Sequence, residues 1–132
     1  MAIPLPEELR SILDDIAIAH VATVGPDGHP QNTAMWIMRD GDHIILNTSE
    51  GRVKWHNMRR DPRVGVSIST LGEDEINFSV KGRVVEMRTS DGFEVIDTLA
   101  HKYLGVDRYP WLSESEVRVT IVVEALGVTR SA

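Results

Sequence analysis

Residues 47–68 read NTSEGRVKWHNMRRDPRVGVSI, a passage with clear signals for where a helix and a strand begin and end. Ser49 can cap a helix, and the pair Asp61-Pro62 would end it near Arg60, so we expect a helix over residues 50–60. The alternation that follows, through residues 64–70, is typical of a half-buried strand. The stretch therefore predicts a strand end, a loop, a short helix and a further strand.

Charge is concentrated in the same stretch. The chain of 132 residues has a formal net charge of -6, yet Arg52 to Arg63 contains five cations and one anion. This segment carries +4, so the rest of the chain carries -10. Arg52 and Lys54 would lie near the start of the predicted helix, where the helix dipole disfavours cations. Two readings stay open: solvated cations paired with acids such as Glu50, or a site that binds an anion.

A phosphate is one anion that this position could hold. It would receive backbone N–H groups and the hydroxyl of Ser49, together with the fork of Arg52 and the charge of Lys54. Gly51 would allow the backbone to approach it closely. Arg59 and Arg60 suit the negative end of the helix dipole, so we interpret them as structural.

The rest of the chain predicts a small antiparallel β protein. A helix begins near Pro6, and a further helix begins around Thr89 to Asp91 and ends at Gly105. Residues 71–75 read as a polar connection. Strands are expected over residues 19–24, 30–38, 43–47, 64–70, 76–84 and 117–124, where Gly82 fits a bend or a close backbone approach. We expect one domain over residues 1–132, a mainly β fold with peripheral helices whose six strands close as a barrel.

Composition excludes several classes of function. There are no cysteines, which removes thiol catalysis, disulfides and iron–sulfur clusters. The five histidines have no helical metal-ligand spacing, so no metal site is expected. The acidic balance disfavours nucleic-acid binding, and no signal peptide or membrane span is visible. We therefore expect a cytoplasmic protein.

The chain resembles the pyridoxamine 5'-phosphate oxidase-like split β-barrel family. The segments that carry the resemblance span residues 9–128: HVATVGPDGHPQ, a strand ending in MW, the stretch quoted at the start with its GRxKxxNxxRDPRV pattern, FSVKGRVVE, KYLG, YPW and VRVTIVVE. More narrowly, the chain looks like the actinobacterial branch of flavin/deazaflavin oxidoreductases that use coenzyme F420.

The resemblance implies a homodimer with two cofactors in grooves at the subunit interface. It implies that Arg52 and Lys54 hold the cofactor phosphate. It also implies cofactor contacts from Asn47, Thr48, Ser49 and Gly51, a ring-binding surface made of Gln31, Thr33, Ala34, Met35 and Trp36, and a substrate pocket reached by Tyr109 and Trp111.

Two departures from the family pattern bear on function. Trp55-His56 stands where smaller or basic pairs are common, which could alter contacts with the cofactor's tail. The chain is also short after Val128 and lacks the extension that completes the substrate site of true pyridoxamine phosphate oxidases. Oxidation of pyridoxamine phosphate is therefore not expected.

The expected activity is that of an F420H2-dependent reductase, which transfers hydride to a small conjugated or quinone-like substrate. Because the cofactor carries such chemistry, no catalytic side chain is assigned. Two alternatives remain open: an FMN-dependent oxidase or reductase of the same fold, and a non-enzymatic carrier or sensor of a cofactor or haem.

Overall fold

The computed structural model describes residues 1–72 and 75–131. Residues 73, 74 and 132 lie outside the described part, so the predicted polar connection over residues 71–75 is described only in part. The elements in chain order are α1 (Glu7–Leu13), β1 (Ala17–Val24), β2 (Pro30–Met35), β3 (Met38–Asp40), β4 (His43–Ser49), α2 (Val53–Arg60), β5 (Arg63–Thr70), β6 (Asn77–Arg88), α3 (Gly92–Leu104) and β7 (Arg118–Ser131).

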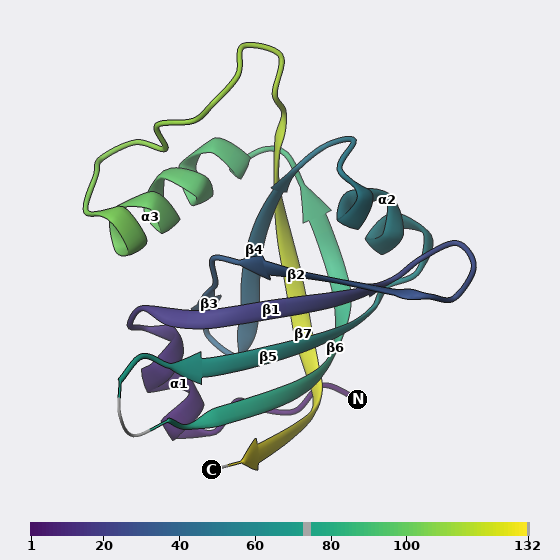
Figure 1. The fold of residues 1–132 in the computed structure, drawn as a ribbon, viewed down its shortest axis with the longest axis vertical. Helices are drawn as coiled ribbons and strands as arrows, with labels where there is room; N and C mark the ends of the chain where they lie inside the picture. Colours follow the sequence, from purple (N-terminus) through teal and green to yellow (C-terminus); the bar gives the residue numbers. More distant parts are fainter. Residues whose placement is uncertain (73–74, 132) are drawn as a thin grey trace.

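The strands form one antiparallel sheet in the order β2-β1-β5-β6-β7-β4-β3. Figure 1 shows that β1 and β2 run across β4 and β7, so the sheet is strongly curled. Its two outermost strands, β2 and β3, follow each other in the chain and are separated only by Trp36 and Ile37. The sheet therefore winds round as a split barrel would, but the ladder does not close.

The prediction of six strands in a closed barrel was wrong at this point. The expected strand over residues 30–38 is two strands, because the backbone of Ile37 leaves the sheet ladder. Its N–H donates to the Tyr103 hydroxyl (3.3 Å), and its carbonyl accepts from Lys102 Nζ (2.6 Å). Two side chains of α3 thus replace the strand partners that Ile37 would otherwise need.

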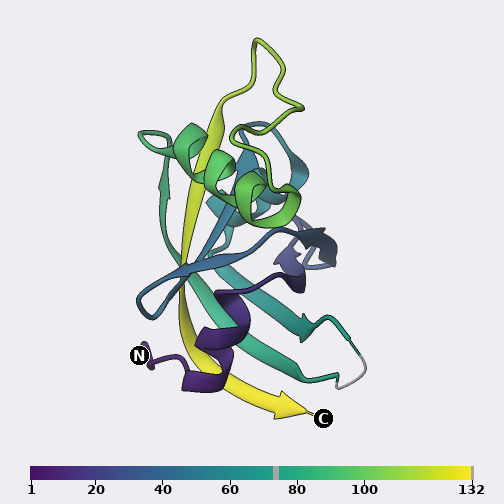
Figure 2. The ribbon, with the colours of Figure 1, turned by 90° about the vertical axis from the view of Figure 1, so that its left-hand side faces the viewer.

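The core fills the inside of the curled sheet. Along β1, Ala17, Ala19 and Val21 are buried and alternate with exposed residues, as a strand with one covered face requires. Helix α1 buries Leu9 and Leu13 against this core. Figure 2 shows α1 and both termini at one end of the molecule, with α3 and the loop after it at the other end.

Strands β6 and β7 are longer than expected and bend together. Their pairing shifts register between Lys81 and Gly82, and a Cβ on Gly82 would lie 2.7 Å from Val123 Cγ1. These observations agree with the expectation that Gly82 fits a bend or a close backbone approach.

The predicted cap of α2 was wrong. Ser49 is the last residue of β4, and the helix begins only at Val53, with Arg52 in extended conformation at the N-cap position. The Ser49 hydroxyl donates to Glu116, because β4 is paired with β7 up to this residue. Gly51, at φ 91°, then turns the chain into the helix, a conformation that favours glycine.

Candidate functional site

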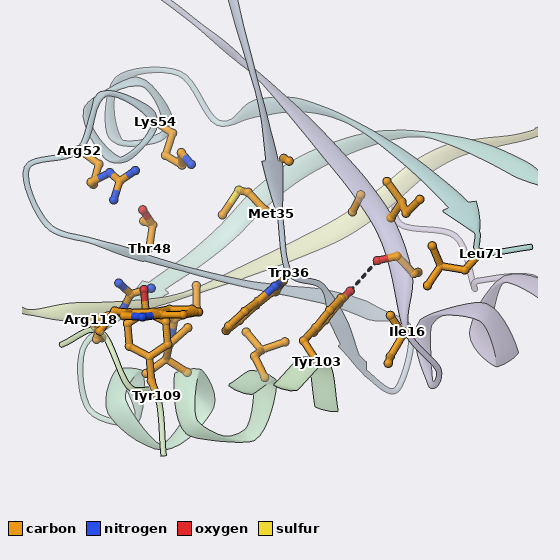
Figure 3. Close-up of a pocket in the computed structure, with 18 residues that line it drawn as sticks. Ile16, Met35, Trp36, Thr48, Arg52, Lys54, Leu71, Tyr103, Tyr109 and Arg118 are labelled. Carbon is orange, nitrogen blue, oxygen red and sulfur yellow. Dashed lines mark hydrogen bonds between the residues drawn. The ribbon is translucent and has the colours of Figure 1, made fainter. Parts of the chain in front are cut away.

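A pocket of about 500 Å³ lies between the start of α2, the β2–β3 break, α3 and the beginning of β1 (Figure 3). This volume is within the range of pockets that hold small ligands and cofactors. Most of the wall is apolar, and the charged groups gather at one end. The lining residues are Ile16, Ala17, Ile18, Ala19, Ala34, Met35, Trp36, Asn47, Thr48, Arg52, Lys54, Leu71, Ile96, Leu99, Tyr103, Tyr109, Trp111 and Arg118.

The charged end contains three cations, Arg52, Lys54 and Arg118. Figure 3 shows Arg52 and Lys54 coming from the start of α2, above Thr48, with Arg118 on the other side of Thr48. Lys54 is only 8% exposed, and within the described residues its ammonium has neither a hydrogen bond nor an ion pair. Burial lowers the pKa of Lys54, and the charges of Arg52 and Arg118 lower it further. A bound anion would relieve this repulsion.

Arg118 is a member of the site that the sequence analysis missed. Its Nε donates to Asn47 Oδ1 (2.8 Å), and its Nη1 donates to Ser49 Oγ (2.9 Å) and to the carboxylate of Glu116. Burial opposes the charge of Glu116, but hydrogen bonds from Ser49 and Arg118 outweigh it and lower its pKa. The sequence did contain a signal for this role: Arg118 is a charged residue at the start of an apolar strand, and it follows Glu116 by two residues.

Four aromatic rings make the next part of the wall. Trp36 stacks on Tyr103, with ring centroids 5.3 Å apart and planes 9° from parallel. Tyr109 meets Trp36 edge-on at 5.9 Å, and Trp111 lies 6.4 Å from Trp36. Such rings offer flat faces and edges against which a conjugated ligand can pack.

Lys102 and Tyr103 hold this wall in place. The Tyr103 hydroxyl donates to Ala17 O (2.8 Å) and accepts from Ile37 N–H, while Lys102 Nζ donates to Leu13 O and Ile37 O, both at 2.6 Å. Burial lowers the pKa of Lys102 to about 8, against the opposing effect of Asp14 and Asp15. The roles of Lys102 and Tyr103 could not be predicted from sequence, because the residues that they contact lie 65 or more positions away in the chain.

The structure brings together most of the residues predicted for the site. The pocket is lined by Ala34, Met35, Trp36, Asn47, Thr48, Arg52, Lys54, Tyr109 and Trp111. Ser49 lines an adjacent polar hollow of about 540 Å³ that also borders Arg52, Tyr109 and Trp111.

Three predicted residues are not among those that line the pocket. Gln31 accepts a hydrogen bond from Thr23 Oγ1 (3.3 Å), and Gly51 lies exposed in the turn before α2. Thr33 Oγ1 is buried without a hydrogen-bond partner in the described residues.

The other cations of the basic stretch have contacts within the protein. Arg59 lies over the Trp55 ring at 4.6 Å, and Arg60 donates to Val24 O and Asn57 Oδ1. Arg63 pairs with Asp61 at 2.6 Å and lowers the pKa of that carboxyl to about 2. The structural interpretation of Arg59 and Arg60 agrees with these contacts.

The fold and pocket together define a split-barrel-like scaffold with a site suited to a planar ring that carries an anionic group. Residues 5–127 match the model of the family described as pyridoxamine 5'-phosphate oxidase, and the chain belongs to that family. The sequence resemblance to this family is thereby confirmed.

Solved structures share this fold. A protein described as an F420 reductase is 28% identical, with a TM-score of 0.81 over 95% of this chain and 98% of that one. A conserved hypothetical protein from Mycobacterium tuberculosis is 24% identical, with a TM-score of 0.74 over 98% and 85%. An FMN-binding protein from Syntrophomonas wolfei subsp. wolfei is 10% identical, with a TM-score of 0.65 over 86% and 76%. At these identities, the last two show the fold alone.

A comparison with curated proteins found no match. Among the residues that the structure describes, no helix is both long and apolar enough to cross a membrane.

Proposed function

We propose that this protein is an F420-dependent oxidoreductase that reduces a small conjugated or quinone-like molecule. The observation that carries the proposal is the buried side chain of Lys54, whose ammonium has no hydrogen bond or ion pair to any described residue. It lines a pocket whose other wall is aromatic. The similarity to a protein described as an F420 reductase, at 28% identity over nearly the full length of both chains, supports this cofactor over others.

The residues of the pocket fit a deazaflavin or flavin. Arg52 and Lys54 would hold its phosphate, since three cations converge there and Glu116 is paired with Arg118. Ala34, Met35 and Trp36 would border its ring, and Thr48 would offer a hydroxyl between the two regions. When bound, the reduced cofactor supplies the hydride. The protein therefore has to bind and orient the cofactor and its substrate, and to exclude water from them.

A second copy of the chain would complete the site in this proposal. Ile16, Ile18 and Leu71 line the pocket yet remain 40%, 43% and 59% exposed. An apolar wall that is open to water in one copy is the kind of surface that a partner subunit covers. We therefore propose a homodimer with the cofactor near the interface.

Turnover tests the proposed activity. Reduced F420 and, separately, reduced FMN are mixed without oxygen with the protein and a panel of quinones and enones. We expect substrate-dependent oxidation of reduced F420 that exceeds the reaction without protein. Faster oxidation of reduced FMN would instead favour the FMN-dependent alternative, and tight binding without turnover would favour a carrier.

A further inference from the structure

The charges at the basic end of the pocket do not balance. Arg52, Lys54 and Arg118 supply three positive charges, and Glu116 is the carboxylate that pairs with Arg118. In the described residues, neither Arg52 nor Lys54 has an ion pair of its own. Positive charge therefore dominates the lining of this end of the pocket, while the carboxylates of Glu50 and Glu116 line the adjacent polar hollow.

The guanidinium of Arg118 is fixed before any ligand arrives. Asn47, Ser49 and Glu116 accept from its Nε and Nη1, its side chain is 6% exposed, and the Tyr109 ring lies 5.2 Å from its Cζ. These contacts leave Nη2 without a partner among the described residues, although Nη2 carries two N–H donors. A buried, oriented and partly unused guanidinium at a pocket wall is prepared to bind an acceptor.

We propose that Arg118 is a third anion-binding residue, whose Nη2 donates to the cofactor's phosphate while Glu116 holds the guanidinium from behind. This inference rests on the proposed function. The positive charge at this end of the pocket suits an anionic phosphate, either the monoester of FMN or the phosphodiester of F420.

Binding of phosphate-bearing and phosphate-free ligands tests this role. FMN is compared with riboflavin, and F420 with the ribityl deazaflavin that lacks its phosphate and tail, by fluorescence titration at fixed salt. The variants are Arg118→Lys and the double substitution Arg118→Met with Glu116→Gln. The double variant leaves no unpaired buried carboxylate and keeps the net charge of the site. Arg63→Gln, an exposed cation paired with Asp61, is the matched control.

We expect the double variant to lose about tenfold in affinity for the phosphate-bearing ligand of the pair that the protein binds, with less than twofold change for its phosphate-free counterpart. Arg118→Lys should show a smaller loss in the same direction, because an ammonium cannot keep all the contacts of the fork. The pair that shows the effect, FMN or F420, identifies the source of the phosphate.

Three other results are distinguishable. Equal weakening of both members of a pair would give Arg118 a purely structural role and overturn the inference. Unchanged phosphate discrimination in both Arg118 variants, with discrimination lost in Lys54→Ala, would also overturn it while leaving the proposed function intact. A wild-type protein that binds phosphate-bearing and phosphate-free ligands equally would contradict the proposed function itself.

Discussion

At the scale of single residues, Lys54 is one of the residues proposed to bind the cofactor's phosphate. Replacing it with Ala should weaken F420 or FMN binding by at least about 1–2 kcal/mol, because a charge-assisted contact is lost. Fluorescence titration measures the change, with circular dichroism to check the fold and Arg63→Gln as the control. Unchanged affinity in Lys54→Ala would sink the assignment.

Lys102 makes a residue-scale prediction about pH. The pKa of Lys102 is about 8 in the folded protein, against 10.5 for an ordinary lysine. The protonated form of Lys102 is therefore less stable in the folded protein than in the unfolded chain, which lowers the free energy of unfolding. This penalty is complete below pH 8 and disappears as the pH rises to 10.5. The stability of the wild type relative to Lys102→Met should therefore increase by about 1–2 kcal/mol over that range, after allowance for partial exposure.

Urea unfolding of both proteins at several pH values measures this difference. Lys81→Met, which removes an exposed lysine from β6, is the control. If the free energy of unfolding of the wild type, relative to that of Lys102→Met, decreases between pH 8 and 10.5, the assigned direction of the Lys102 pKa shift is wrong.

At the scale of elements, the start of α3 supports the anion site. Gly92 O accepts from Asn47 Nδ2 (2.8 Å), and a Cβ on Gly92 would lie only 1.9 Å from Arg118 O. Gly92→Ala should therefore push α3 away from β7, lower the free energy of unfolding by about 2 kcal/mol or more and weaken cofactor binding. Gly65→Ala, where the nearest contact is 3.9 Å, is the matched control.

Denaturant unfolding and titration of these two glycine variants provide the measurement. The control should be near neutral, because an added methyl there meets only ordinary contact. Equal stability of Gly92→Ala and Gly65→Ala would show that α3 has room to move without cost.

The same scale shows what sequence could predict. Arg52 and Lys54 could be predicted as candidate site residues from one short segment, because both are cations near a helix start, where the helix dipole disfavours positive charge. The break at Trp36-Ile37 could not be predicted, because residues 30–38 read as a continuous strand. The groups that bond to the Ile37 backbone in place of a neighbouring strand come from α3, which is distant in the sequence. Arg118 escaped for the same reason: its position on a strand is visible, but its contacts with Asn47 and Ser49 depend on the pairing of β4 with β7.

At the scale of the whole molecule, the proposed homodimer should cover the exposed apolar wall of the pocket and shield it from water. Sedimentation should give twice the 14.7 kDa mass of the chain. Ile18→Glu, at an exposed position of β1, should produce monomers and weaken cofactor binding about tenfold. Val85→Glu, at a comparably exposed position of β6 that does not line the pocket, should leave both unchanged. A wild-type monomer at every concentration would rule the homodimer out.

A parallel fluorescence titration of the cofactor-free protein with F420 and with FMN tests the proposed cofactor most directly. We expect saturable binding of F420 that is tighter than binding of FMN and weakens with added salt, because the positive charge of the site attracts an anion. Tighter binding of FMN would assign the pocket to a flavin, and no saturable binding of either cofactor would contradict the proposed function.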